Sequence, residues 1–481
     1  MELPQLKLSE SEIKKEDPWA DDALKRSFCA ETLTNFLKDQ NSALTVALNG
    51  PWGTGKTFFL KRWAQDLKNN GHEVVYFNAW QDDCLEDPLV AIVGQLWKNL
   101  KGGTFDELCS SLKGAAVPVL RKVGVGLLNQ GFKISTGISV EAISEECLKT
   151  GSESAFDEYE KQTKYREEFK KRLQDLTDKI FKETENSLVF IVDELDRCRP
   201  DFAVKVLERI KHLFDIDHVI FVLGIDREQL GHVIRSVYGD IDVENYLHRF
   251  IDLDFLLPKI ETSSFVGYLW QKYEIPKNLS GKASVYPQNR GDIDEGQVFE
   301  ILLTDLLAFH NLSLREIEHC LKIYVLLLRA TPAHIQTWPQ LAAILIILKH
   351  RDRNLYRRWL ENSATPNEIA DKVLPLEIKS ERMTSYLLLL AVVYSSFKEP
   401  YFVNPGTGST ETVLGLINAI KEKDGASILS HPFSGKILKK LRQKELETFI
   451  KYVDSLGGIN RSALFELSKR IDLIQDDSHM L

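Results

Sequence analysis

The chain has 481 residues, of which 43% are hydrophobic and 27% are charged, and its formal net charge is −9. This length exceeds one ordinary compact core, and the balance of residue types is that of a globular protein rather than a disordered one. A mildly acidic chain does not indicate nucleic-acid binding. The six cysteines show no Cys-x-x-Cys spacing, which favours free thiols and a cytoplasmic location.

No targeting or membrane-spanning segment is predicted. Residues 1–20 form a polar leader without the apolar run of a signal peptide. No stretch reaches the roughly 18 uninterrupted apolar residues that a membrane helix needs. Of the longest apolar runs, Gly114–Leu128 is broken by Pro118, and Leu341–Leu348 is too short. We interpret both as buried helices, with a membrane-associated segment as the less favoured alternative for the first.

Residues 21–260 carry the pattern of an α/β core. Five short runs are rich in β-branched, aromatic and other apolar residues: Leu44–Leu48, Val74–Phe77, Leu188–Val192, Val219–Gly224 and Phe250–Phe255. Nearly continuous apolar character over so few residues is typical of parallel strands that helices cover on both faces. The sequence therefore predicts a parallel five-stranded sheet.

Helices are predicted for most of the remaining chain. A helical insertion spans about residues 85–185 between the second and third strands, and its charged last part is interpreted as a solvated helix face. Residues 261–350 are expected to form a helical lid, interrupted by a flexible polar loop at Ile275–Gly296. Residues 351–481 are expected to form a helical C-terminal domain.

A phosphate-binding motif follows the first predicted strand. The pattern G-x-x-x-x-G-K-[ST] is matched at every position by Gly50, Pro51, Trp52, Gly53, Thr54, Gly55, Lys56 and Thr57. The glycines allow successive backbone N–H groups to point at phosphate oxygens, and the helix that follows adds the positive end of its dipole. Lys56 is expected to reach the β- and γ-phosphates of ATP, and Thr57 to ligate Mg²⁺.

Two carboxylates end the third predicted strand. Asp193 and Glu194 follow five apolar residues, at the edge of a parallel sheet where ligands collect. Asp193 is expected to hold Mg²⁺ through water, and Glu194 to orient and polarise the attacking water. Acidic residues also end strands as helix caps, but the complete phosphate-binding motif upstream favours catalysis. The predicted catalytic residues are therefore Glu194, Lys56 and Asp193.

Four more polar residues are candidates for the nucleotide site. Asp226 and Arg227 follow the fourth predicted strand, where they either sense the γ-phosphate or cap the next helix. Arg315, in the predicted lid, either closes over the nucleotide or forms a surface salt bridge. Arg249 precedes the last predicted strand and is a candidate arginine finger that would act on a neighbouring subunit of a homo-oligomer.

These motifs resemble the KAP family of P-loop ATPases over about residues 21–345. The resemblance rests on GPWGTGKT at 50–57, FNAW at 77–80, DELDRC at 193–198, GIDREQL at 224–230 and YLHRFI at 246–251. It implies the P-loop division with an additional strand and a catalytic glutamate beside the Walker B aspartate. Many members carry aspartate in place of Glu194, lysine in place of Arg249, and membrane helices between the two Walker motifs.

Three function classes remain open. The favoured one is an ATP-driven switch or assembly ATPase, whose state a protein partner reads through the helical C-terminal region. The others are a small-molecule P-loop kinase and an ATP-dependent scaffold with little turnover. Glu194 favours hydrolysis over phosphotransfer, and nucleotide-bound Mg²⁺ is the only metal expected. Several bacterial members of the resembled family are similar to antiviral defence components, so the resemblance also implies a role in phage defence.

Overall fold

The computed structural model describes residues 13–119, 155–279, 295–332, 339–373 and 461–473, apart from positions 21, 23, 39, 101–103, 362 and 365. The chain divides into two compact units between Lys259 and Ile260. We call Glu10–Lys259 the core unit and the part from Ile260 the helical unit, and describe each by itself. The finer division of the helical unit into a lid and a C-terminal domain stays a prediction.

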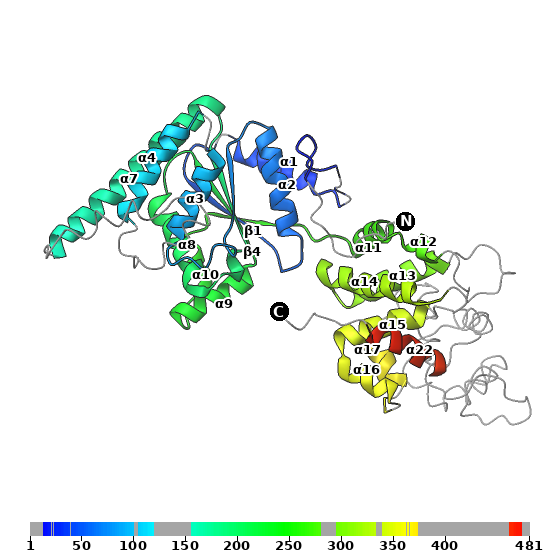
Figure 1. The fold of residues 1–481 in the computed structure, drawn as a ribbon. Helices are drawn as coiled ribbons and strands as arrows, with labels where there is room; N and C mark the ends of the chain where they lie inside the picture. Colours follow the sequence, from blue (N-terminus) through cyan, green and yellow to red (C-terminus); the bar gives the residue numbers. More distant parts are fainter. Residues whose placement is uncertain are drawn as a thin grey trace, which may run out of the picture. The chain divides into compact units, whose positions relative to one another are not determined.

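A parallel five-stranded sheet forms the centre of the core unit (Figure 1). Its strands are β1 (Leu44–Asn49), β2 (Val74–Asn78), β3 (Leu188–Asp193), β4 (Val219–Ile225) and β5 (Leu253–Leu256). Their spatial order is β2-β3-β4-β1-β5, and every neighbouring pair is parallel. The predicted sheet is confirmed, and the additional strand is β4, which lies between β1 and β3.

Two hydrophobic clusters cover the two faces of this sheet. Alternate residues of β3 point to opposite faces, as expected for a strand: Val189 and Ile191 belong to one cluster and Phe190 and Val192 to the other. The first cluster includes side chains of α1 (Ser27–Leu37) and α2 (Lys56–Asn69). The second includes side chains of α3 (Pro88–Leu100), α8 (Pro200–Leu213) and α9 (Arg227–Tyr238). Both faces are therefore covered by helices, which explains the nearly continuous apolar strands.

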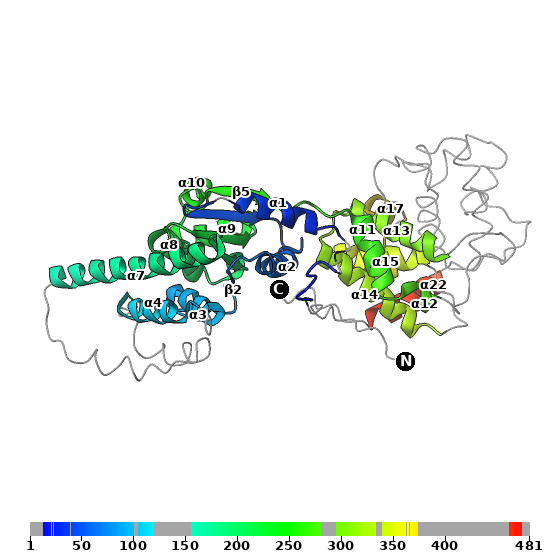
Figure 2. The same cartoon turned by 90° about the horizontal axis from the view of Figure 1, so that it is seen from above.

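The insertion between β2 and β3 contains a long pair of helices. Besides α3 it holds α4 (Asp106–Val119) and α7 (Ala155–Thr184). Helices α4 and α7 pack along one another and extend beyond the sheet (Figures 1 and 2). Phe169, Leu173 and Ile180 of α7 are fully buried, so only the charged remainder of α7 can form the predicted solvated face.

The last strand is shorter than the apolar run predicts. The run indicates a strand over Phe250–Phe255, but β5 begins at Leu253. The N–H groups of Phe250 and Ile251 both donate to the carbonyl oxygen of Leu247, so these two residues complete the turn after α10 (Val243–Leu247). Their side chains are nevertheless buried. Their apolar character reflects the burial of their side chains. The sequence pattern therefore could not distinguish a buried turn from a strand.

The helical unit contains only helices and their connections in the described ranges. Its helices are α11 (Thr262–Lys272), α12 (Ile275–Leu279), α13 (Glu295–Phe309), α14 (Leu314–Ala330), α15 (Pro339–Arg351), α16 (Arg353–Leu360), α17 (Pro366–Val373) and α22 (Arg461–Asp472). The predicted loop at Ile275–Gly296 is wrong at its ends, since α12 and the start of α13 occupy them; residues 280–294 lie outside the described part.

The apolar runs noted in the sequence are partly accounted for by these helices. Leu341–Leu348 lies within α15 and is fully buried. The run Gly114–Leu128 enters α4 up to Val119, and its remainder lies outside the described residues. Across the part of the chain that the structure describes, no helix is both long and apolar enough to cross a membrane.

Gly224 lies where β4 passes the end of β3, and this position has no room for a side chain. An added Cβ would collide with Leu60 Cδ1 and lie 3.0 Å from Asp193 Oδ1, and Leu60 is fully buried. We expect Gly224→Ala to lower the free energy of unfolding by about 1–3 kcal/mol, the usual cost of overpacking a core. Urea denaturation followed by circular dichroism measures this change.

Gly114→Ala provides the control for that substitution. Gly114 is exposed in the middle of α4, and an added Cβ would meet nothing within 4 Å. Alanine should therefore raise the free energy of unfolding by roughly 0.5–1 kcal/mol, because glycine is unfavourable inside a helix. Equal effects of the two substitutions would contradict the close packing inferred at Gly224.

Candidate active site

The phosphate-binding loop connects the end of β1 to the start of α2. Gly53 and Gly55 have φ angles of 80° and 88°, in the left-handed region that glycine adopts without steric cost. Gly55 is the N-cap of α2, and no side chain caps this helix. The first N–H groups of α2 therefore have no N-cap side chain as acceptor, which is the arrangement that binds an anionic ligand. The loop fits the triphosphate that its sequence predicts.

The side chain of Lys56 folds back onto the main chain at the beginning of the loop. Its Nζ lies 2.5 Å from the carbonyl oxygen of Gly50 and 3.4 Å from that of Pro51. Only 8% of Lys56 is exposed. Burial lowers the pKa of its ammonium group, and the nearby carboxylates of Asp196, Asp226 and Asp193 oppose this shift. One buried cation thus lies among three acids, an electrostatic setting that favours a second cation.

Asp193 meets Thr57 at the end of β3. The Asp193 carboxylate accepts hydrogen bonds from the Thr57 hydroxyl and, at 2.7 Å, from the Tyr76 hydroxyl. Burial raises the pKa of this carboxyl, and the bonds from Tyr76 and Thr57 partly offset that rise. The structure therefore brings the two predicted metal-ligating residues into contact. A carboxylate and a hydroxyl are the hard oxygen donors that Mg²⁺ prefers, so this pair fits the expected ion.

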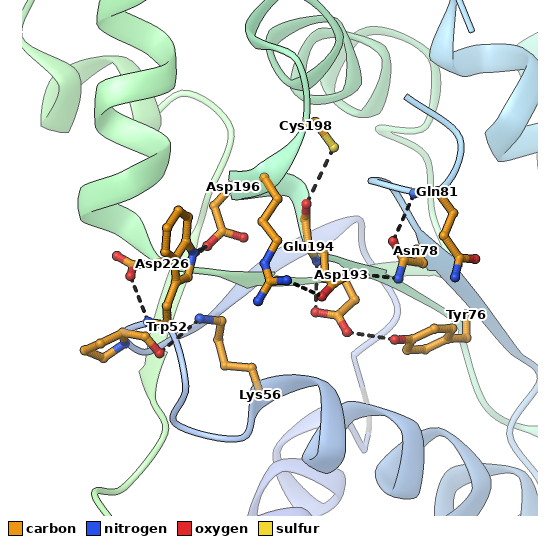
Figure 3. A network of polar contacts seen from close by, with 12 residues as sticks. Trp52, Lys56, Tyr76, Asn78, Gln81, Asp193, Glu194, Asp196, Cys198 and Asp226 are labelled. Carbon is orange, nitrogen blue, oxygen red and sulfur yellow. Dashed lines mark hydrogen bonds and ion pairs between the residues drawn. The ribbon is translucent and has the colours of Figure 1, made fainter. Parts of the chain in front are cut away.

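Glu194 has a partner for each carboxylate oxygen (Figure 3). Asn78 Nδ2 donates to Oε2 at 2.8 Å, and Arg197 Nη1 lies 3.2 Å from Oε1. The backbone of Glu194 has φ 61°, a conformation that non-glycine residues rarely adopt and that is found at functional sites more often than elsewhere. The side chain is therefore held in one position by its own strained backbone and by two neighbours.

A third carboxylate connects the phosphate-binding loop to the turn after β4. Asp196 lies in the 3₁₀ helix η1 (Leu195–Arg197), and only 4% of it is exposed. Its Oδ2 accepts from the Trp52 indole N–H at 2.6 Å and from the Asp226 backbone N–H at 3.0 Å. Asp226 Oδ2 in turn accepts from the Trp52 backbone N–H at 3.0 Å (Figure 3). Three segments of the chain are thereby held together at one side of the loop.

Comparison with known proteins places this site in a family. The model described as "KAP family P-loop domain" matches residues 26–329, well over half of the chain. The chain belongs to the KAP family of P-loop proteins. The expectation drawn from the five motifs is thus confirmed, and we refer to the matched region as the KAP domain.

The chain is also similar to curated sequences and solved structures. The "Phage T7 exclusion protein" of Escherichia coli K12 is 22% identical over 311 residues, which cover 59% of this chain and 38% of that protein. The chain thus spans less than half the length of that relative. The ORC2 protein of Aeropyrum pernix is 13% identical, with a TM-score of 0.33 and 93% of each chain covered. PCH-2 of C. elegans is 12% identical, with a TM-score of 0.29 and coverage of 70% of this chain and 69% of that chain.

Of the two roles that the sequence left open for Asp226 and Arg227, the structure shows the helix cap, which Asp226 provides. Asp226 caps α9 by accepting from the Gln229 N–H, and it also contacts the phosphate-binding loop. Arg227 forms ion pairs with Glu244 at 2.7 Å and Asp254 at 2.5 Å. Its guanidinium is thus already paired with two carboxylates of the KAP domain, so its role in sensing the γ-phosphate stays a prediction.

The two other predicted arginines are exposed within their own units. Arg249 is exposed between α10 and β5. Arg315 is exposed in the first turn of α14, beside the capping box that Ser313 and Glu316 form. Their proposed actions, across a subunit interface and as part of a lid, both stay predictions.

The structure adds Tyr76, Asn78 and Asp196 to the site, none of which had a predicted role. Tyr76 and Asn78 belong to β2, which pairs with β3 so that Asn78 lies opposite Asp193. The carboxyl ends of parallel strands meet at one edge of the sheet. A polar residue ending the second predicted strand was therefore a usable signal for Asn78. Asp196 belongs to the DELDRC motif at 193–198, but nothing in the sequence indicated what its carboxylate contacts.

Proposed function

We propose that this KAP protein binds Mg-ATP at residues 50–57, hydrolyses it, and acts as a molecular switch or assembly ATPase. The observation that carries the proposal is the placement of Glu194. It follows Asp193, the acid in contact with Thr57, and its side chain belongs to the same group of polar residues as Lys56 (Figure 3). A carboxylate next to a metal ligand is the group that orients and deprotonates an attacking water.

The residues of the site divide the work between binding and chemistry. The uncapped N-terminus of α2 and the Lys56 ammonium would hold the β- and γ-phosphates. Thr57 and Asp193 would hold Mg²⁺, which neutralises charge on the phosphate oxygens when bound. Glu194 would accept the proton of the attacking water, while Asn78 and Arg197 keep its carboxylate oriented.

Asn78 should matter for turnover more than for binding. We expect Asn78→Ala to lower kcat by about 10- to 100-fold, as is typical when a partner that orients a functional group is removed. The KM for ATP should change little, because Asn78 contacts Glu194 and not the phosphate-binding loop. Steady-state kinetics of phosphate release measure both constants. A raised KM with an unchanged kcat would contradict this positioning role.

The biological role is proposed from the relative and from the second unit. A relative named for phage exclusion supports a role in phage defence for this chain as well. The helical unit would present the nucleotide state to a protein partner, and Arg249 would act in a homo-oligomer. A cytoplasmic location is part of the same proposal.

The fate of the γ-phosphate separates the three function classes. ATP labelled at the γ-phosphate would be incubated with the full-length protein and Mg²⁺, and the label followed by chromatography. The hydrolase proposal expects free phosphate without any added acceptor. Label found only on a small acceptor would establish the kinase, and ATP that stays bound and intact would establish the scaffold.

A further inference from the structure

Arg26 is a buried cation that donates a hydrogen bond to the main chain of the phosphate-binding loop. It directly precedes α1, and only 3% of it is exposed. Its Nη2 donates to the carbonyl oxygen of Thr54 at 3.1 Å, and its Nη1 donates to the carbonyl oxygen of Pro258 at 2.7 Å. Both acceptors are main-chain atoms. Burial of a guanidinium has a substantial free-energy cost, so this arrangement calls for a role beyond filling space.

The second acceptor lies at the very end of the core unit. Pro258 is two residues before Ile260, where the helical unit begins. The preceding residue, Leu257, is buried in the cluster that contains side chains of α1 and α2. Its N–H donates to the carbonyl oxygen of Asn49 at 2.9 Å, directly before Gly50. The segment that leads out of the core unit is therefore bonded to the last residue of β1 and, through Arg26, to the middle of the phosphate-binding loop.

The Arg26 guanidinium connects the Thr54 and Pro258 carbonyls rigidly. Its two nitrogens belong to one planar group, so the Thr54 and Pro258 carbonyls cannot reorient independently while both bonds persist. A lysine offers a single point charge and would not bridge two acceptors in this way. Any ligand that fixes the Thr54 peptide thus also restrains Pro258.

We infer that Arg26 is a positioning residue that couples occupancy of the phosphate-binding loop to the segment Leu257–Ile260. The inference rests on the proposed binding of ATP, and it adds the route by which the bound state reaches the beginning of the helical unit. A nucleotide in the loop orders Thr54, Arg26 transmits that order, and the segment becomes less accessible.

Trypsin provides a direct probe, because Lys259 is exposed and is followed by Ile260. Full-length protein would be digested with and without a non-hydrolysable ATP analogue and Mg²⁺, and cleavage after Lys259 quantified by mass spectrometry. We expect the nucleotide to slow this cleavage in the wild type by about 5-fold or more, the lower end of typical coupling between two sites. In Arg26→Met and Arg26→Lys the ratio should fall to about 1 at saturating nucleotide.

Arg199→Met is the control. Arg199 is exposed, but like Arg26 it donates to two main-chain carbonyls of the same unit, those of Asp83 and Leu85. It should keep the wild-type ratio. Calorimetry would verify nucleotide binding for each variant. A wild type that binds no nucleotide would refute the proposed function, and with it the coupling. A wild type that binds but shows equal cleavage with and without nucleotide, or an Arg26 variant that keeps the wild-type ratio, would overturn the coupling alone.

Discussion

Glu194→Gln should leave ATP binding intact and reduce turnover by about 10²- to 10⁴-fold, the usual contribution of a positioned general base. Glutamine has nearly the same shape and can still accept a hydrogen bond from Asn78, so the surroundings of the side chain persist. It cannot take a proton from water, and it loses the ion pair with Arg197. Phosphate release under saturating ATP measures the loss, and calorimetry measures the affinity.

Glu228→Gln is the control for this substitution. Glu228 is an exposed acid in the first turn of α9, in the same unit, and it should leave turnover close to that of the wild type. A Glu194→Gln protein that hydrolyses ATP at the wild-type rate would remove Glu194 from the mechanism. The proposal of a hydrolase would then need another base.

Lys56→Ala should weaken ATP binding by about 100-fold or more, because two charge-assisted hydrogen bonds to phosphate oxygens contribute about 1.5 kcal/mol each at the low end. The substitution also removes the donor to the Gly50 and Pro51 carbonyls. The three acids around this position would then face the phosphates without the cation that offsets them. Calorimetric titration with Mg-ATP measures the affinity.

Lys68→Ala separates this effect from a general loss of positive charge. Lys68 is exposed in the last turn of α2, roughly 18 Å along the helix from its first residue at 1.5 Å per residue. It should bind Mg-ATP like the wild type. Unchanged affinity in Lys56→Ala would mean that the loop does not grip the triphosphate through this side chain.

The sheet, the glycine-rich loop and the pair of acids at the end of β3 were predictable from the sequence, because each appears as a local pattern. A strand buried on both faces must be apolar along its whole length, so β1, β3 and β4 stand out in the sequence. A loop that wraps a phosphate needs glycines at Gly53 and Gly55. The same reasoning failed for Phe250 and Ile251, since an apolar side chain reports burial and not the course of the backbone.

The contacts between the site residues could not be predicted from the sequence. Each residue was noted within its own motif, but contacts such as Trp52 with Asp196 or Asn78 with Glu194 join residues 144 and 116 positions apart. Hydrogen bonds of this kind depend on strand order and register. Neither quantity follows from a window of a few residues.

By itself, the sequence determined that a phosphate-binding loop follows one buried strand and that two acids end another, because backbone freedom and burial constrain residue types locally. Only the tertiary structure decided that Asp196 joins the loop to Asp226, and that Arg26 reaches Pro258 across 232 positions of sequence. Such links arise when packing brings distant segments together, and a polar or charged residue looks the same in sequence whether its partner is water or a buried carbonyl.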